Sequence, residues 1–341
     1  MKPVRIAING FGRIGRLFFR QVYNQDWCEI VGVNDLGNID NLAYLLKYDS
    51  VYRTFSESVR VENDHVVVGK SAIPFFHEPN PENLPWKKLG VDIVIESTGV
   101  FTTYEKASAH LSAGAVHVLM SAPSQDDDGE KGTTVLVGVN EEDLSRCSIS
   151  SNASCTTNAI SSPLAILSET IGVSKAMLST VHGYTSTQSL VDTVQKGSDV
   201  RRGRAAAQNI IPSTTGAAHA LGRAQKSFAK AFDGIAFRVP VIAGSVADVV
   251  FVSKRKTNVE EVNELLEKGV ADARWRGTFA VTRDPVVSSD IIGMPYGALV
   301  DLSYTRVVDG DLVKILSWYD NEWGYVATLR AHAEAIAHHR L

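Results

Sequence analysis

A glycine pattern near the start of the chain constrains its fold more than any other feature. The segment IAINGFGRIGR, residues 6–16, places Gly10, Gly12 and Gly15 between a β-branched run and a helical pattern. At such a strand–turn–helix junction the first glycine permits a tight turn, the second lets the backbone approach a pyrophosphate, and the third lets the helix pack on the strand. The helix N-terminus adds free N–H groups and a positive dipole end. The pattern predicts a dinucleotide site; the alternative is a glycine-rich turn that only packs tightly.

An acidic residue stands where such a site needs one. Asp35 ends the second β-branched run, EIVGVND (29–35), roughly 25 residues after Gly10. A carboxylate there accepts hydrogen bonds from ribose hydroxyls and repels a 2′-phosphate. The following segment, LGNIDNLAYLL (36–46), contains no Arg or Lys that could hold a 2′-phosphate. The expected cofactor is therefore NAD rather than NADP.

The first half of the chain alternates short β-branched runs with amphipathic helical patterns. Buried parallel strands are predicted over 4–10, 29–35, 92–99 and 116–123, with helices over 13–25 and 103–115. The stretch 58–76 differs, because it reads as an antiparallel hairpin that turns at Asn63-Asp64. This alternation is typical of a doubly wound parallel sheet.

The pattern changes near residue 150. Longer strands are predicted over 175–185, 234–242, 246–254 and 298–320, the last with a turn at Asp309-Gly310, and helices up to about Ile171, over 259–275 and over 324–341. The weakly periodic segment 183–204 is expected to form a long functional loop. We predict an α/β Rossmann-type doubly wound NAD-binding domain over 1–151, on which the C-terminal helix 321–341 packs back. An α+β catalytic domain with a mainly antiparallel sheet, including loop 183–204, is predicted over 152–320.

Composition argues against several classes of protein. The 341 residues are 44% hydrophobic and 21% charged, which is typical of a globular chain of about two domains. The net charge of −4 gives no reason to expect nucleic acid or an anionic membrane as partner. No apolar run approaches the roughly 20 residues that span a bilayer, and the N-terminus lacks signal-peptide features. The three cysteines, Cys28, Cys147 and Cys155, lack metal-ligand spacing, so no metal and a reducing cytoplasm are expected.

The segment SSNASCTTNAI, residues 151–161, gathers small polar residues around Cys155. Ser154 and the three residues after the cysteine are good capping residues, so Cys155 is expected in the first turn of a helix. There the helix dipole stabilises a thiolate, and free N–H groups can form an oxyanion site. His182, at the end of the strand pattern MLSTVH, is a candidate base. On these residues alone, a buried structural thiol and a structural histidine stay open as alternatives.

Six motifs occur in one order along nearly the whole chain: GFGRIGR, SNASCTTN, HGYT, RAAAQNIIPSTTGAA, AFRVP and WYDNEWGY. In this combination the chain closely resembles the phosphorylating glyceraldehyde-3-phosphate dehydrogenases, and SNASCTTN is specific to that family and to its close relative, erythrose-4-phosphate dehydrogenase. The resemblance implies that Cys155 attacks the aldehyde to give a hemithioacetal, and that His182 activates the thiol and serves as base during hydride transfer to NAD. Inorganic phosphate then cleaves the thioester to an acyl phosphate, 1,3-bisphosphoglycerate, in glycolysis or gluconeogenesis. Sulfur and imidazole suit these steps, because a thiolate is a strong nucleophile and imidazole titrates near neutral pH.

The same resemblance implies a set of binding residues. Thr185 and Arg238 are expected at the substrate phosphate, and Ser154, Thr156, Thr215 and Gly216 at inorganic phosphate, with Arg202 as a helper. The expected cofactor contacts are Gly10, Phe11, Gly12, Arg13, Ile14, Gly15, Asn34, Asp35, Ser97, Thr98, Gly99, Ser121, Asn321 and Tyr325, with Asn321 at the nicotinamide amide. Taken singly, each hydroxyl could be a turn or cap residue and Arg238 a surface ion-pair residue. Loop 183–204 matches the segment that reaches a neighbouring subunit's cofactor site, so a homotetramer is expected.

The chain departs from the family pattern at four places. Ala159 replaces a common second cysteine, Val194 a proline frequent in NAD-specific members, and His219 a frequent lysine, while 241–249 (VIAGSVADV) differs from the usual segment after FRVP. Val194 weakens the expectation of NAD; none of the four is a residue expected to carry catalysis. Two other functions remain: oxidation of erythrose 4-phosphate to the free acid, and a non-catalytic NAD-binding sensor or scaffold. The Cys–His pair argues against the second, since a pure binder does not need it.

Overall fold

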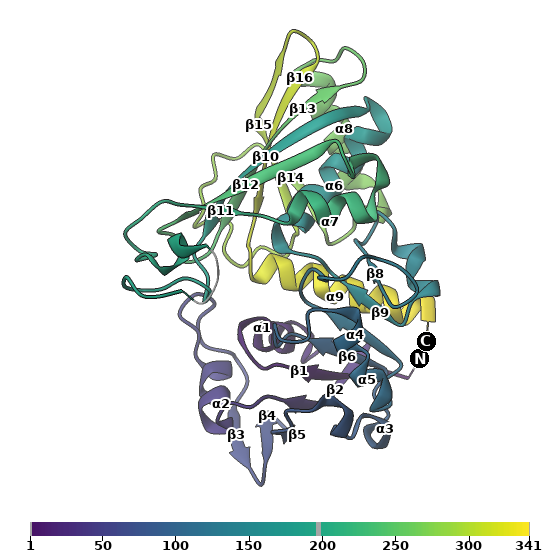
Figure 1. The fold of residues 1–341 in the computed structure, drawn as a ribbon, viewed down its shortest axis with the longest axis vertical. Helices are drawn as coiled ribbons and strands as arrows, with labels where there is room; N and C mark the ends of the chain where they lie inside the picture. Colours follow the sequence, from purple (N-terminus) through teal and green to yellow (C-terminus); the bar gives the residue numbers. More distant parts are fainter. Residues whose placement is uncertain (1, 196–198, 341) are drawn as a thin grey trace. The chain divides into compact units, whose positions relative to one another are not determined.

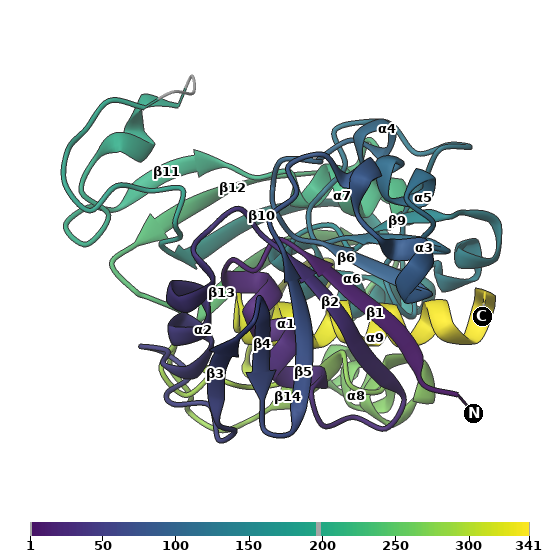
Figure 2. The same cartoon turned by 90° about the horizontal axis from the view of Figure 1, so that it is seen from below.

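The computed structural model describes residues 2–195 and 199–340, which divide into two compact units. Unit 1 contains the residues up to Val135, Asn140–Ala153 and the residues from Leu329 onward, and unit 2 contains Leu136–Val139 and Ser154–Thr328. Residues 196–198 of the predicted loop 183–204 lie outside the described residues. Each unit is built on its own sheet, as Figures 1 and 2 show.

Unit 1 holds a largely parallel sheet. Its strands are β1 (Val4–Asn9), β2 (Cys28–Asn34), β3 (Val59–Glu62), β4 (His65–Val68), β5 (Ser71–Phe76), β6 (Ile93–Glu96), β7 (His117–Met120), β8 (Thr133–Thr134) and β9 (Ile149–Ser151). Its helices are α1 (Arg13–Val22), α2 (Ile39–Lys47), α3 (Trp86–Leu89), α4 (Tyr104–Ala107) and α5 (Ala109–Ser112). Over the described residues the strand order is β3-β4-β5-β2-β1-β6-β7-β9-β8, and all pairs from β5 to β8 are parallel. The prediction of a doubly wound Rossmann-type sheet is therefore confirmed.

The centre of this sheet is where its connections change direction. β1 pairs with β2 on one side and with β6 on the other, and Asn9, the last residue of β1, lies opposite both Asn34 and Glu96. Ligands of doubly wound sheets bind outside the carboxyl ends of the strands at such a point. The fold thus brings the glycine-rich turn, the end of β2 and the end of β6 to one edge.

Two local predictions for unit 1 need correction. The stretch 58–76 forms three antiparallel strands: the turn at Asn63-Asp64 is confirmed, and a second turn at Gly69, with φ +55, adds β5. The single helix predicted over 103–115 is split into α4 and α5 at Ser108, whose hydroxyl donates to the Glu105 carbonyl oxygen at 2.6 Å. A serine that bonds nearby backbone in this way competes with the regular helical ladder.

Unit 2 holds a mainly antiparallel sheet, as predicted. Its strands are β10 (Val173–Gly183), β11 (Ile211–Thr214), β12 (Phe232–Val239), β13 (Ser245–Ser253), β14 (Phe279–Thr282), β15 (Ala298–Val308) and β16 (Leu312–Tyr319). Its helices are α6 (Cys155–Thr170), α7 (Ala217–Ala224) and α8 (Val259–Ala271), while α9 (Trp323–Arg340) begins among the residues of unit 2 and ends among those of unit 1. In the described order β11-β12-β10-β13-β16-β15-β14, only the β10–β12 and β14–β15 pairs are parallel. The turn at Asp309-Gly310 joins β15 to β16 with positive φ at both residues.

Helix α6 is packed against several other elements of unit 2. It contacts α7, α8 and the strands β10, β13, β15 and β16, on the side of the sheet where Figure 1 draws these helices. Its residues from Thr156 to Leu167 are all buried. Short 3-10 helices occur at Pro81–Asn83, Glu141–Arg146, Val200–Gly203, Lys226–Phe228 and Ala273–Trp275. Burial along most of α6 makes its first residue, Cys155, a rigidly held position.

Candidate active site

The glycine-rich turn after β1 leaves room for a ligand at one of its three glycines. Gly10 has φ +94, and a Cβ there would lie 2.5 Å from Thr98 N. A Cβ at Gly15 would lie 2.1 Å from the Gly10 carbonyl oxygen, so close backbone contacts require glycine at both positions. At Gly12, the residue before α1, no described atom lies within 4 Å of the Cβ position. This open position precedes the free N–H groups of α1, where a pyrophosphate would bind.

A cavity of about 280 Å³ lies beside this turn in unit 1. It is lined by Asn9, Gly10, Gly12, Asn34, Asp35, Leu36, Glu78, Pro79, Ser97, Thr98, Val100 and Phe101. Of the predicted cofactor residues, Gly10, Gly12, Asn34, Asp35, Ser97 and Thr98 are brought together here. Sequence reasoning did not predict the other six lining residues. For Asn9 its position at the end of a parallel strand was a usable signal, whereas no sequence pattern marked Glu78 or Pro79 as cavity residues.

Backbone N–H groups hold Asp35 at the cavity wall. Its Oδ2 accepts from Phe11 N at 2.6 Å, and its Oδ1 accepts from Gly37 N at 2.8 Å. Because an ionised carboxylate has about four lone-pair sites, these two bonds leave capacity for a ribose diol. The geometry therefore fits the ribose-binding role predicted for this residue.

A buried hydrogen-bond network fixes the strand ends under the cavity. Asn9 Nδ2 donates to Glu96 Oε2 at 2.6 Å, and Asn9 Oδ1 accepts from Asn34 Nδ2 at 2.7 Å. Glu96 Oε1 accepts from the backbone N and the hydroxyl of Thr98, at 2.9 and 2.5 Å. His110 Nε2 lies 3.1 Å from Glu96 Oε2. These bonds link the ends of β1, β2 and β6, so they fix the positions of the residues that line the cavity.

Several predicted cofactor residues take other positions. The Phe11 side chain is fully buried against Phe19, so only its backbone can serve a ligand. Arg13 pairs with Asp49 and lies over the Tyr52 ring, 5.2 Å from its centroid. The predicted cofactor residues that do not line the cavity are of two kinds. Six belong to unit 1: Phe11, Arg13, Ile14, Gly15, Gly99 and Ser121. The other two, Asn321 and Tyr325, belong to unit 2.

Cys155 occupies the first position of α6, as the capping pattern predicted. Ser154 is the N-cap, and its Oγ accepts from Thr157 N at 3.1 Å. Ala153 immediately before it has φ +55, a conformation uncommon outside glycine, which turns the chain sharply into the helix. Cys155 keeps partial exposure, unlike the buried residues after it. Cys155 is therefore partly exposed as a residue, and its thiol lies at the positive end of the helix dipole.

The structure brings His182 to this thiol. His182 Nε2 lies 3.4 Å from Cys155 Sγ, although the two residues are 27 positions apart. The parallel register of β10 and β12 places Arg238 opposite His182, and Arg238 Nη1 lies 2.7 Å from His182 Nδ1. A thiol, an imidazole and a guanidinium thus meet at the ends of α6, β10 and β12.

Burial controls the protonation of this cluster. Burial first, and the positive charge of Arg238 second, together lower the pKa of His182 to about 3. Burial raises the pKa of the Cys155 thiol above the usual value, while the charge of Arg238 acts against the rise. Burial also raises the pKa values of Cys28 and Cys147, to about 12 and about 11. At neutral pH the cluster holds a neutral imidazole, which can accept a proton, beside the thiol of a partly exposed cysteine.

Tyr319 at the end of β16 is a site residue that sequence reasoning missed. Its hydroxyl lies 2.9 Å from Thr156 Oγ1 and 2.7 Å from Thr180 Oγ1. Its ring meets the imidazole of His182 edge to face, with centroids 5.8 Å apart. The motif WYDNEWGY contained this tyrosine, but nothing in the motif indicated that it would restrain the histidine.

Ser245 at the start of β13 is a second missed residue. Its hydroxyl donates to Asn321 Oδ1 at 2.9 Å and accepts from Gly183 N at 3.1 Å. The predicted nicotinamide-binding residue, Asn321, is therefore tied to the residue that follows His182. Tyr325, in the first turns of α9, is buried.

The arginine predicted to help at inorganic phosphate lies near Arg238. Arg202 donates from Nε and Nη2 to Ser213 Oγ at 3.1 and 2.9 Å, and its Nε lies 3.4 Å from Asp199 Oδ2. The pKa of Arg238 is lowered first by burial, and the positive charge of Arg202 contributes to the lowering. The charges of the two guanidinium groups therefore interact, and Asp199 offsets part of the charge of Arg202.

The remaining predicted phosphate residues lie at turns and caps. Thr185 Oγ1 lies 2.9 Å from Thr187 Oγ1. Gly216 is the N-cap of α7, and Thr215 Oγ1 accepts from Ala217 N at 3.3 Å. The hydroxyl of Thr156 is engaged by Tyr319, as described above.

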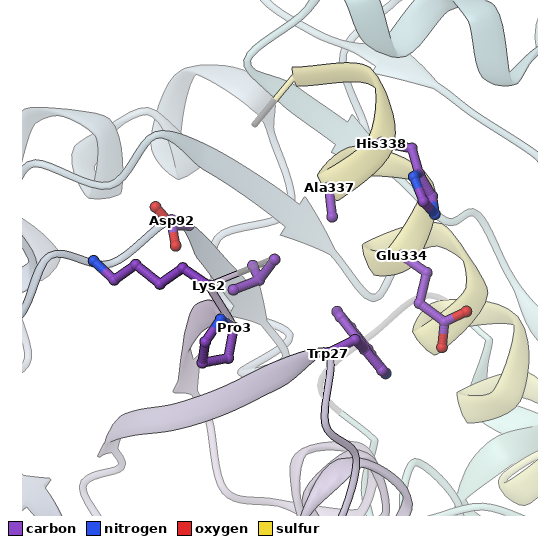
Figure 3. A pocket seen from close by; sticks show the side chains of 8 residues that line it. Lys2, Pro3, Trp27, Asp92, Glu334, Ala337 and His338 are labelled. Carbon is purple, nitrogen blue, oxygen red and sulfur yellow. The ribbon is translucent and has the colours of Figure 1, made fainter.

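A larger cavity, of about 540 Å³, lies elsewhere in unit 1 (Figure 3). It is lined by Lys2, Pro3, Val4, Trp27, Asp92, Glu334, Ala337 and His338, none of which is a predicted site residue. Over residues 2–195 and 199–340, no group of three or more His, Cys, Asp or Glu side chains could hold a metal ion. Among the helices that these residues form, none is long and apolar enough to cross a membrane.

Comparison with known proteins assigns the chain to a family. Residues 4–104 match the family model "Glyceraldehyde 3-phosphate dehydrogenase, NAD binding domain", and residues 154–321 match "Glyceraldehyde 3-phosphate dehydrogenase, C-terminal domain". Glyceraldehyde-3-phosphate dehydrogenase of Thermotoga maritima is 47% identical over 325 residues, which cover 94% of this chain and 95% of the relative. Glyceraldehyde-3-phosphate dehydrogenase 2 of Streptomyces avermitilis is 45% identical with the same coverage, and the Clostridium pasteurianum enzyme is 41% identical over 98% of both chains. With both domain models matched and the likeness extending over nearly its whole length, this chain belongs to the glyceraldehyde-3-phosphate dehydrogenase family.

Proposed function

We propose that this protein oxidises glyceraldehyde 3-phosphate to 1,3-bisphosphoglycerate, with NAD as the hydride acceptor and inorganic phosphate as the attacking group. The observation that carries the proposal is the 3.4 Å contact between Cys155 Sγ and His182 Nε2. A nucleophile and a base within hydrogen-bond reach are the arrangement that covalent catalysis at a carbonyl requires. Family membership supports the same assignment.

In the first step, Cys155 Sγ attacks the aldehyde carbon and its thiol proton passes to His182 Nε2. The carbonyl oxygen, which free N–H groups in the first turn of α6 are placed to stabilise, takes this proton back from His182 and becomes the hydroxyl of a hemithioacetal. His182 then accepts the hemithioacetal hydroxyl proton as a hydride leaves the same carbon, giving a thioester on Cys155. NAD, when bound, accepts this hydride. Phosphate finally attacks the thioester carbon, and the Cys155 thiolate leaves.

We assign the substrate phosphate to Arg238 and Thr185. Arg238 is half-buried beside His182, so its guanidinium can pair with a phosphate on the same molecule that reacts at the sulfur. We assign inorganic phosphate to Ser154, Thr156, Thr215 and Gly216, with Arg202 adding positive charge. Ser154 and Gly216 cap α6 and α7, where free N–H groups favour anions. Each hydroxyl keeps unused donor or acceptor capacity beside its present bond.

We assign the NAD site to the cavity in unit 1 beside the glycine-rich turn. The open Cβ position at Gly12 leaves space for a pyrophosphate. The segment that follows Asp35, residues 36–46, contains no Arg or Lys to bind a 2′-phosphate, which favours NAD over NADP. Asn9, Ser97 and Thr98 supply further polar groups at the cavity wall. Asn321 and Tyr325 are proposed to serve the nicotinamide end.

We further propose that the protein is a homotetramer of two-domain subunits, divided near residue 151, in the cytoplasm. The proposal of self-association is supported by exposed apolar side chains on the sheet of unit 2, where Met177 and Leu312, 59% and 42% exposed, line one surface pocket. Exposed apolar surface of this kind marks interaction sites. A reducing compartment suits the mechanism, because the chemistry needs Cys155 as a free thiol.

One assay tests the reaction against its alternatives. Formation of NADH is measured with glyceraldehyde 3-phosphate and with erythrose 4-phosphate, each with and without inorganic phosphate. We expect turnover of glyceraldehyde 3-phosphate that depends on phosphate. Equal turnover without phosphate would contradict the proposal, and faster turnover of erythrose 4-phosphate to the free acid would favour the other enzyme activity.

Replacement of the nucleophile tests the covalent step. C155S is expected to lose turnover while it keeps NAD binding, because Cys155 belongs to unit 2 and the glycine-rich cavity to unit 1. C28A is the control, since that thiol is buried and its pKa is raised to about 12. Unchanged activity of C155S would refute a thioester mechanism and leave a binding role.

A further inference from the structure

The carboxylate of Glu96, the last residue of β6, accepts four hydrogen bonds next to the cavity of unit 1. Its Oε1 accepts from the backbone N and from the hydroxyl of Thr98, at 2.9 and 2.5 Å. Its Oε2 accepts from Asn9 Nδ2 at 2.6 Å and from His110 Nε2 at 3.1 Å. An ionised carboxylate has about four lone-pair sites, so these four donors use its whole capacity. Glu96 is 3% exposed, and water therefore does not replace these donors freely.

The proton on His110 is placed by a second buried side chain. Trp86 Nε1 lies 3.0 Å from His110 Nδ1, and because an indole N–H can only donate, Nδ1 accepts. A neutral imidazole whose Nδ1 accepts carries its proton on Nε2, and this proton points to Glu96. His110 and Trp86 have no exposed surface, and neither of them lines the cavity. Their role is to hold the carboxylate in place.

One part of the cavity wall depends on Glu96 through Thr98. The N–H and the hydroxyl of Thr98 both point to Glu96, and Thr98 Oγ1 accepts from Val100 N at 3.0 Å. Gly99, between Thr98 and Val100, has φ +72, so the chain turns through the left-handed region that favours glycine. Thr98 and Val100 line the cavity. The carboxylate thus fixes the turn 97–100.

A second part of the wall depends on Glu96 through two buried amides. Because Asn9 donates its Nδ2 to Glu96, its Oδ1 faces Asn34 Nδ2, 2.7 Å away. Asn34 Nδ2 also donates to the Glu78 carbonyl oxygen at 3.0 Å, and Asn34 Oδ1 accepts from Glu78 N at 2.9 Å. Glu78 and Pro79 line the cavity. Each amide orientation follows from its neighbour, and the series begins at a group that can only accept.

We propose that Glu96 is a positioning residue for NAD, because it sets the position of the turn 97–100 relative to the segment 78–79. Asp35, the residue assigned to a ribose, lines the same cavity as both segments, so the adenosine half of the cofactor is the part that this carboxylate serves. Glu96 does not line the cavity and acts through Thr98 and Asn9. A wall held in advance lowers the cost of ordering it when the ligand binds. This inference rests on the proposed function, in which the cavity holds NAD.

The E96Q variant tests the proposal with little change in side-chain size. It replaces one carboxylate oxygen by an amide group that donates. In one orientation this amide faces the two donors of Thr98, and in the other it faces Asn9 and His110. Two donors lose their acceptor in either case, so one part of the wall shifts. We expect the Kd for ADP-ribose, which has the adenosine half but no nicotinamide, to rise roughly tenfold or more. The KM for NAD is expected to rise with it, while kcat at saturating NAD is unchanged.

Two further variants separate positioning from stability and from charge. H110A leaves Trp86 Nε1 without its acceptor but keeps the bonds from Thr98 and Asn9 to Glu96. It is expected to unfold at a lower urea concentration than the wild type and to keep the wild-type Kd for ADP-ribose. E96D keeps the negative charge but is one methylene shorter, so it does not reach Thr98 and Asn9 together. It is expected to weaken ADP-ribose binding as E96Q does, and it carries the test if E96Q does not fold.

The measurement is calorimetric titration of the full protein and each variant with ADP-ribose, beside urea unfolding of the same samples. An unchanged Kd in E96Q or E96D would overturn the proposal. Equal weakening by H110A would also overturn it, because loss of stability would then explain the effect. D35A is titrated in the same way: if D35A alone weakens binding, the positioning role fails and the cofactor site stands. If none of these variants weakens binding, the assignment of NAD to this cavity fails as well.

Discussion

The buried histidine on α9 provides a quantitative prediction about acid stability. His332 has no exposed surface; its Nδ1 bonds Asn152 Oδ1 at 3.1 Å, and its Nε2 is buried without a hydrogen-bond partner among the described residues. Burial lowers the pKa of His332 from 6.5 to about 3. The neighbouring His117 is also buried, and its pKa is lowered by burial and by His332. The native state therefore holds His332 in its neutral form.

The sign of the pH effect follows from this shift. Because the pKa is lower in the folded chain than in the unfolded chain, the unfolded chain binds a proton below pH 6.5 that the folded chain does not bind until about pH 3. Stability is therefore lost as the pH falls, by about 1.4 kcal/mol per pH unit for one such group. Between pH 7.5 and pH 5.0, His332 alone lowers the free energy of unfolding by about 2 kcal/mol.

Proton uptake measures this effect without the need for reversible unfolding. At pH 5.0 the unfolded His332 is almost fully protonated and the folded one almost fully neutral, so unfolding in urea binds about one more proton in the wild type than in H332Q. The exposed His339 on the same helix is the matched control, and H339Q is expected to keep the wild-type proton uptake. Equal uptake by H332Q and the wild type would refute the reasoning from burial.

Three further predictions concern the two candidate sites. Iodoacetamide is expected to modify Cys155 ahead of Cys28 and Cys147, because Cys155 is partly exposed whereas the other two are buried, with pKa values raised to about 12 and about 11; peptide mass spectrometry gives the order, and earlier modification of either buried thiol would contradict it. D35A is expected to weaken NAD binding by roughly tenfold and to reduce the preference for NAD over NADP, because a hydrogen-bonding carboxylate at the ribose is lost; KM values for both cofactors test this, and an unchanged ratio would remove Asp35 from the ribose site. S154A is expected to lower the free energy of unfolding by about 1 kcal/mol through loss of the α6 cap, and to slow thioester cleavage by phosphate; a stability loss with unchanged phosphate dependence would leave Ser154 as a cap alone.

Local sequence was sufficient for the elements that carry the site. The spacing of Gly10 and Gly15 reflects close backbone contacts, of Gly10 with Thr98 and of Gly15 with Gly10, so the need for glycine at these two positions could be predicted from the pattern. The capping pattern around Ser154 likewise predicted the start of α6, because an N-cap depends on residues within one turn. Turn residues such as Asn63-Asp64 were equally readable, since their positive φ values are a local property.

Sequence patterns failed where a side chain acts through distant neighbours. Tyr319 reaches Thr156 and Thr180 from 163 and 139 positions away, so no local pattern marked it as a restraint on His182. The split of the predicted helix 103–115 at Ser108 was missed because propensity alone does not show when a hydroxyl bonds backbone instead of solvent.

The sequence by itself determined the kinds of element in this protein, its glycine-rich turn, and the placement of a thiol at a helix start, since periodicity, caps and turns depend on neighbours a few residues apart. Only the tertiary structure decided which histidine contacts Cys155. It also decided that Arg238, 56 positions beyond His182, places its Nη1 2.7 Å from Nδ1 of that histidine. That outcome depends on the order and register of strands in the sheet of unit 2, where parallel pairing of β10 with β12 sets His182 opposite Arg238. Strand order and register arise from packing over the whole unit, and a local pattern does not contain them.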